Sequence, residues 1–172
     1  MRELILGGVR SGKSALAEQR ARESDQQVFY IATATTGDAE MAARIAHHRQ
    51  RRPDTWFIIE EPLHLAAALQ SSAAENHCVI VDCLTLWLTN LLLAEELSLF
   101  EQERTALLEL LPALPGQIVL VSNEVGLGIV PLGELSRRFA DEAGRLHQQL
   151  AACCERVTFV AAGLPLILKG SS

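Results

Sequence analysis

The feature that most constrains this chain is a phosphate-binding loop motif close to its first residue. It reads Gly7-Gly8-Val9-Arg10-Ser11-Gly12-Lys13-Ser14 and fits GxxxxGK[ST] without a mismatch. The motif follows a short apolar run at 4–6 and opens a helical pattern, which is the context in which such a loop holds a nucleotide. Its glycines let backbone N–H groups surround phosphate oxygens, and the helix N-terminus adds the positive end of a dipole. Lys13 is therefore expected at the β- and γ-phosphates, and Ser14 at Mg²⁺.

Strand and helix patterns alternate along the rest of the chain. Apolar runs predict strands at 4–6, 28–32, 56–59, 78–81, 118–121 and 157–161, with a further short strand at 166–168. Helical patterns begin at residue 14 and recur at 39–50, 63–71, 84–96, 99–111 and 134–154. This alternation predicts an α/β fold of the P-loop NTPase type, doubly wound, with a mostly parallel sheet and helices on both faces. No repeat or linker divides residues 1–172, so we expect a single nucleotide-binding catalytic domain.

The composition excludes several classes of protein. Hydrophobic residues make up 49% of the 172 residues, which is enough for a continuous core. The 15 basic residues against 21 acidic ones give a net charge of −6, which argues against a nucleic-acid partner. No segment reaches the roughly 20 apolar residues of a membrane span, and the N-terminus has no signal-peptide pattern. The cysteines lack CxxC spacing and are expected to be reduced and mostly buried, as is usual in the cytoplasm: Cys78, Cys83, Cys153 and Cys154.

Polar residues stand where the predicted strands end. They are Thr33, Glu60, Asp82 and the pair Asn123-Glu124. Ligands of such sheets bind beyond the carboxyl ends of the strands, so we expect these residues around the phosphate loop in a single site. Asp82 ends an apolar run, where P-loop proteins hold an acidic residue near the metal. Capping of the next helix is the alternative role, and we favour the metal-side role.

A basic helical pattern at 40–53 contains two adjacent histidines. At 100° per residue, Arg44, His47, His48 and Arg51 fall within about one third of the helix circumference. Such a face offers guanidinium groups and an imidazole to a polyphosphate. From spacing alone, however, a solvated basic helix end is the favoured interpretation, and spacing does not choose between His47 and His48. The remaining histidines stand alone, and ordinary structural roles are expected for them: His64, His77 and His147.

Taken together, these segments resemble the family of bifunctional adenosylcobinamide kinases / adenosylcobinamide-phosphate guanylyltransferases of cobalamin assembly. The phosphate loop alone is shared with many proteins, whereas its GGxRSGKS form, the paired histidines and the NEVGxGIVP segment are far more specific. The matches occur in the family's order over about 4–163. They are the loop at 7–14, Tyr30-Ile31-Ala32-Thr33, Met41-Ala42-Ala43-Arg44-Ile45-x-His47-His48, Arg52-Pro53, Thr89-Asn90-Leu91-Leu92 and Asn123-Glu124-Val125-Gly126-x-Gly128-Ile129-Val130-Pro131.

The resemblance implies two activities. The first transfers a phosphoryl group from ATP or GTP to the aminopropanol arm of adenosylcobinamide, and the second transfers GMP from GTP to that phosphate. The family's guanylylated histidine corresponds to His47, and Arg44 and Arg51 are placed to stabilise charge on the transferring group. Glu61 follows Glu60, so that contact's register stays open. The nucleotide contacts that the resemblance implies are Ile31, Ala32 and Thr33, then His48, Arg49, Gln50 and Arg51, and finally Glu60 and Asp82.

The resemblance also implies a homo-oligomer, described for the family as a trimer, with adenosylcobinamide and its phosphate as substrates. The apolar helix at 84–93 suits either a subunit contact or the core. The region 93–116 carries no motif, and it suits a corrinoid surface or a subunit contact. Two other functions remain open: a P-loop kinase of another small metabolite with a single activity, and a nucleotide switch without catalysis. The match at 123–131 speaks against the single-activity kinase.

Overall fold

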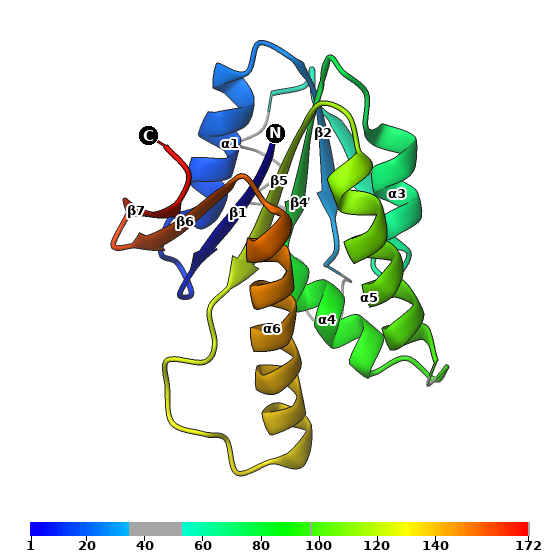
Figure 1. Ribbon diagram of the computed structural model, residues 1–172, viewed down its shortest axis with the longest axis vertical. Coiled ribbons are helices and arrows are strands. Elements are labelled where there is room, and N and C mark those ends of the chain that lie inside the picture. Colours follow the sequence, from blue (N-terminus) through cyan, green and yellow to red (C-terminus); the bar gives the residue numbers. More distant parts are fainter. Residues whose placement is uncertain (35–52, 97, 172) are drawn as a thin grey trace.

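The computed structural model describes residues 1–34, 53–96 and 98–171. Strands and helices alternate in it as the sequence predicts (Figure 1). The predicted helix at 39–50 lies outside the described residues. The elements are β1 (Arg2–Gly7), α1 (Lys13–Glu23), β2 (Gln27–Ala32), β3 (Phe57–Glu60), α3 (Leu65–Ser72), β4 (His77–Asp82), α4 (Leu84–Leu92), α5 (Leu99–Leu110), the short 3-10 helix η1 (Leu111–Ala113), β5 (Gln117–Asn123), α6 (Glu134–Cys153), β6 (Arg156–Ala161) and β7 (Leu164–Lys169).

The strands form one seven-stranded sheet in the order β3-β2-β4-β5-β1-β6-β7. Every neighbouring pair is parallel except β6 and β7, which are antiparallel. The sequence-based prediction of a mostly parallel α/β sheet is therefore confirmed. The strand β1, which leads into the phosphate loop, lies in the interior of the sheet between β5 and β6.

Helices cover both faces of the sheet, and the alternation of side chains along each strand explains how. Ile5 of β1 packs in a cluster with Ala17 and Ala21 of α1 on one face. Leu4 and Leu6 point to the opposite face, because successive side chains of a strand alternate. There they join a larger cluster with apolar side chains of α3, α4, α5 and α6. Figure 1 shows α6 packed in front of the sheet and α1 on its other side.

Two of the described helices differ from the prediction by two or more residues at one end. The helix expected at 63–71 begins at Leu65, because the Glu61 carboxylate accepts hydrogen bonds from the backbone N–H groups of Leu63 (2.9 Å) and His64 (2.8 Å) and holds them in a turn. The helix expected at 84–96 ends at Leu92, although its apolar pattern continues. Its apolar face, including the fully buried Trp87, packs within this chain, so the structure assigns that face to the core.

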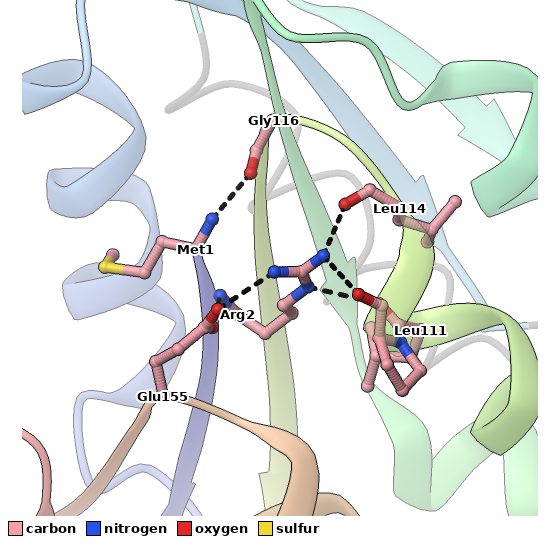
Figure 2. A network of polar contacts seen from close by, with 7 residues as sticks. Met1, Arg2, Leu111, Leu114, Gly116 and Glu155 are labelled. Atoms are coloured by element: carbon pink, nitrogen blue, oxygen red, sulfur yellow. Dashed lines mark hydrogen bonds and ion pairs between the residues drawn. The ribbon is translucent and has the colours of Figure 1, made fainter.

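The amino ends of the strands are tied together by Arg2, on the edge of the sheet opposite the phosphate loop. Its guanidinium donates to the carbonyl oxygens of Leu111 (3.1 Å), Pro112 (2.6 Å) and Leu114 (2.6 Å) and pairs with Glu155 (2.9 Å), as Figure 2 shows in part. The Arg2 backbone N–H also donates to Glu155. These carbonyls follow α5, where helix ends leave carbonyls unpaired. Arg2 therefore joins β1 to the ends of two helical segments.

In the part of the chain that the structure describes, no helix combines the length and the apolar character needed to cross a bilayer.

Candidate nucleotide site

The carboxyl ends of five strands form a row at one edge of the sheet. Gly7 of β1 is paired with Asn123 of β5, and Ala32 of β2 is paired with Asp82 of β4 on one side and with Glu60 of β3 on the other. The strand order β3-β2-β4-β5-β1 therefore places in one row the ends that the sequence predicts to carry the site. Parallel sheets bind ligands at this edge.

The phosphate loop joins the end of β1 to the start of α1 and packs tightly against the end of β6. A Cβ atom at Gly7 would lie 2.3 Å from the carbonyl oxygen of Val160, so only glycine fits there. Gly12 has a φ of 104°, a conformation that side chains disfavour. On its outer side the loop is braced by the turn between β6 and β7, because the Gly163 N–H donates to the carbonyl oxygen of Ser11 (2.8 Å).

Lys13 lies inside the loop at the first turn of α1. Its side chain is 6% exposed, and its Nζ donates to the carbonyl oxygen of Gly8 (2.7 Å). Burial lowers the pKa of Lys13, and the negative charge of Asp82 opposes that shift. The ammonium group is thus held at the centre of the loop, where phosphate oxygens can replace the carbonyl as its partner.

The hydroxyl groups of the loop suit an anionic ligand and a metal ion. Ser11 Oγ is buried and has no hydrogen-bond partner in the described structure, which is the state expected of a group that binds a ligand. Ser14 is half-buried in the first turn of α1. Among the described residues no group of three or more His, Cys, Asp or Glu side chains could hold a metal.

Asp82 ends β4 between the loop and the end of β2. Its Oδ2 accepts a hydrogen bond from the Tyr30 hydroxyl (2.5 Å), and its charge acts on Lys13. The residue at the N-cap of α4 is Cys83, and no side chain caps that helix. The helix-cap role considered for Asp82 is therefore not observed, and its role beside a metal ion stays a prediction.

The end of β2 offers backbone rather than side chains to a ligand. Ile31 and Thr33 are fully buried, and Ile31 belongs to the large apolar cluster. The Thr33 hydroxyl donates to the Cys83 carbonyl (2.7 Å) and accepts from the Cys83 N–H (3.0 Å), so it joins β2 to the start of α4. Contacts of this segment with a nucleotide would come from its backbone and from Ala32, which is half-buried.

Glu60 and Glu61 have different surroundings. Glu60 is exposed at the end of the edge strand β3, and the Glu61 carboxylate accepts hydrogen bonds at the turn before α3. Glu60 as the nucleotide contact stays a prediction. The other candidates lie outside the described residues: Arg44, His47, His48, Arg49, Gln50 and Arg51.

The sequence did not identify a buried polar cluster behind β5. A hydrogen bond joins His147 Nε2 to Ser122 Oγ (2.7 Å). On the other side of the ring, His147 Nδ1 lies 3.6 Å from Glu124 Oε2. Burial lowers the pKa of His147, and Glu124 opposes that shift. The Glu124 N–H in turn donates to the Gly7 carbonyl (2.9 Å). Because a lone histidine on an amphipathic helix usually has a structural role, only the spatial pairing reveals this link to the phosphate loop.

Comparison with known proteins identifies the family. Residues 3–168 match the family described as cobinamide kinase / cobinamide phosphate guanyltransferase. The chain belongs to this family. Over 170 residues it is 65% identical to the bifunctional adenosylcobalamin biosynthesis protein CobP of Pseudomonas aeruginosa, covering 99% of this chain and 98% of that protein. It is 42% identical to the corresponding protein of Escherichia coli, CobU, covering 96% and 98% of the two chains.

Solved structures support the fold of this cobinamide kinase / guanyltransferase family member. A Pyrococcus horikoshii protein superposes with a TM-score of 0.54 at 10% identity, covering 99% of this chain and 87% of that chain. The P4 protein of bacteriophage phi6, solved in complex with ADP, gives a TM-score of 0.50 at 18% identity. That match covers 95% of this chain and 52% of the phage chain. At these identities the likeness concerns the fold alone.

Proposed function

We propose that residues 1–172 act as a single catalytic domain with two successive activities. The first transfers a phosphoryl group from ATP or GTP to the hydroxyl of the aminopropanol arm of adenosylcobinamide. The second transfers GMP from GTP to the new phosphate, giving adenosylcobinamide-GDP and pyrophosphate. The observation that carries this proposal is the intact phosphate loop, with Lys13 held inside it, in a chain 65% identical to a bifunctional adenosylcobalamin biosynthesis protein.

The kinase step needs positioning and charge neutralisation rather than a covalent intermediate. The backbone of the loop and the start of α1 would hold the phosphates, with Lys13 at the transferring group. The residues proposed to bind Mg²⁺ are Ser14 and Asp82, and the bound ion would supply charge neutralisation at the phosphates. The backbone of 31–33 and the Glu60 side chain would contact the rest of the nucleotide.

The guanylyl transfer is proposed to pass through His47. A neutral imidazole nitrogen attacks the α-phosphorus, a P–N bond forms, and the bond to pyrophosphate breaks. The phosphate of the cobinamide then displaces the histidine and takes the GMP. Guanidinium groups of Arg44 and Arg51, together with contacts from His48, Arg49 and Gln50, would stabilise the nucleotide during transfer. The support for these roles is the family's motif at 41–48.

The decisive experiment is to incubate the protein with α-labelled GTP and map the labelled residue. We expect an acid-labile, base-stable label on His47, absent from His47→Ala and retained in the matched neighbour His48→Ala. His47→Ala should still phosphorylate cobinamide measurably, because direct phosphoryl transfer needs no histidine nucleophile.

Two outcomes would contradict the assignment. Labelling that persists in His47→Ala, or disappears only in His48→Ala, would place the nucleophile elsewhere. Phosphorylation of cobinamide without any protein-bound label in the wild type would favour a kinase with a single activity.

We also propose that the protein works in the cytoplasm as a homo-oligomer, a trimer by its resemblance to the family. The four cysteines are free thiols in the structure, which suits a reducing compartment. Several apolar side chains are exposed, as expected of a surface that another subunit covers. They include Leu127, Ile129, Val130 and Leu132 before α6 and Leu164, Leu166 and Leu168 on β7. Light scattering of the purified protein tests the trimer directly, and a monomer would contradict it.

A further inference from the structure

The helix α4 reaches across the row of strand ends with the side chain of Asn90. This residue is half-buried, and its Nδ2 donates hydrogen bonds to the carbonyl oxygens of Thr33 (2.8 Å) and Pro62 (3.1 Å). Thr33 directly follows β2, and Pro62 follows β3 by two residues. One amide group therefore joins the segments that leave two neighbouring strands.

Asn90 acts beyond the end of the backbone ladder. The last paired residues of β2 and β3 are Ala32 and Glu60, followed by a hydrogen bond from the Glu61 N–H to the Ala32 carbonyl (3.0 Å). The sheet is complete at that point without the amide. Beyond this point no backbone ladder joins the described residues that follow β2 and β3. The contacts of Asn90 thus fix the two segments that continue from β2 and β3 on the ligand side of the sheet.

The neighbouring contacts show that both loops are held against the same helix. The Thr33 hydroxyl is bonded to the Cys83 backbone at the start of α4, and the Trp87 ring N–H donates to the Leu63 carbonyl (2.7 Å). The Thr33 N–H donates to the Asp82 carbonyl (3.3 Å). Thr33 is therefore held at its N–H by the Asp82 carbonyl, at its hydroxyl by the Cys83 backbone and at its carbonyl by Asn90.

We propose that Asn90 is a positioning residue of the nucleotide site. It fixes the backbone carbonyls of Thr33 and Pro62, and so holds the segments that directly follow Ala32 and Glu60 in place on the ligand side of the sheet. The inference rests on the proposed function, in which the backbone of 31–33 and the Glu60 side chain contact the nucleotide. Asparagine suits the role because its NH₂ group has two donors, one for each carbonyl. Aspartate has the same shape but turns an acceptor toward both oxygens.

The test compares Asn90→Ala and Asn90→Asp with the wild type. Thr89→Ala is the matched control, because the Thr89 hydroxyl donates to the Thr85 carbonyl (2.9 Å) within the same helix. The measured quantities are the Kd for GTP, the KM for GTP and the kcat of cobinamide phosphorylation, and the unfolding temperature. Both Asn90 variants should weaken GTP binding and raise the KM for GTP about tenfold. Their kcat should stay within about threefold of wild type, because the transferring phosphate is held elsewhere. Thr89→Ala should keep the wild-type Kd.

The proposal is tested by comparing the effect of each Asn90 variant on GTP binding with its effect on stability. Wild-type GTP affinity in both Asn90 variants would overturn the proposal even if they unfold at lower temperature, because the amide would then support only the fold. If neither variant folds, Asn90→Ser is measured as well. Failure of all three would also overturn the proposal, which requires a sheet that is stable without the amide. A wild-type protein that does not bind GTP would overturn the proposed function itself, and this inference with it.

Discussion

Lys13 is a buried cation at the phosphate loop, and its pKa reflects two opposing effects. Its ammonium group is buried in the loop and bonded to the Gly8 carbonyl, while burial lowers its pKa and the Asp82 charge opposes that shift. A buried charge is costly unless it is paired, so this arrangement favours the arrival of a negatively charged group. The lysine is therefore already in place before a phosphate binds.

Lys13→Ala should remove most nucleotide-dependent activity and leave the fold intact. The side chain contributes charge at the phosphates, and loss of such a group commonly lowers kcat/KM by about 100-fold or more. The measurements are the rates of both reactions and the unfolding temperature. Lys169→Ala on β7 serves as a control, since its Nζ donates to the carbonyls that end α6. Rates of Lys13→Ala within a few-fold of wild type would refute the assignment.

Asp82→Asn should raise the Mg²⁺ concentration needed for half-maximal rate. The amide keeps the shape of the side chain but loses the charge that a divalent ion prefers. Tyr30→Phe is the matched control, because it removes the hydrogen bond to Asp82 and leaves the carboxylate in place. A Mg²⁺ titration of the kinase step checks both variants. If Asp82→Asn shows the wild-type Mg²⁺ dependence, the carboxylate does not serve the metal.

At the scale of elements, the ties at the two edges of the sheet have different tasks. The loop edge carries the candidate ligand groups, whereas the opposite edge is held by Arg2 and Glu155 between β1, η1 and the end of α6. Burial raises the pKa of Glu155, but hydrogen bonds from the Arg2 backbone and side chain lower it overall. We therefore expect this edge to contribute to stability and not to nucleotide binding.

Arg2→Ala should destabilise the protein without changing the KM for GTP. Loss of its hydrogen bonds to carbonyls and to Glu155 should cost about 2–3 kcal/mol. For a chain of this size, the unfolding temperature should then fall by roughly 4–10 °C. The unfolding temperature of Arg2→Lys should lie between those of wild type and Arg2→Ala, because lysine keeps the charge but not the planar guanidinium group. A change in KM comparable to that of Lys13→Ala would contradict the division between the two edges.

The difference in stability between wild type and Arg2→Ala should depend on pH, because folding lowers the pKa of Glu155. Folding lowers the pKa of Glu155 from its ordinary value of 4.5, so its pairing with Arg2 stabilises the protein above that value. The contribution is lost as the pH falls through the lower pKa of the folded state. Denaturant unfolding at several acidic pH values should therefore show that the difference in unfolding free energy between wild type and Arg2→Ala becomes smaller as the pH falls. A gap that widens in acid would show that the pairing with Glu155 is not its source.

Elements with strong periodic or motif signals were predictable from the sequence, and those set by tertiary contacts were not. The apolar runs located the interior strands β1, β4 and β5 because each is buried on both faces. The start of α3 was misplaced because Glu61 holds the preceding turn, which periodicity does not register. In the site, motif and strand ends indicated Lys13 and Asp82. The hydrogen bonds of Asn90 and His147 were not predicted, because their partners are far away in sequence.

At the scale of the whole molecule, the phosphate loop is enclosed by segments from the second half of the chain. Its strand pairs with β5 and β6, and the turn after β6 donates a hydrogen bond to the loop itself. Gly7 and Gly12 of the loop accordingly pack closely against Val160 and Gly163. Changes near 160–163 should therefore affect the loop although they lie outside its motif.

The interior position of β1 has a consequence for synthesis on the ribosome. The phosphate loop is translated before both strand partners of β1, which begin at Gln117 and Arg156. A nascent chain that has not yet reached Gln117 thus has no neighbour for β1 on either side. Such distant pairing is formed late, since the intervening chain must first be closed into a loop. Nucleotide therefore cannot act as an early template for folding, and the phosphate loop becomes functional only after strands that are translated much later than it is.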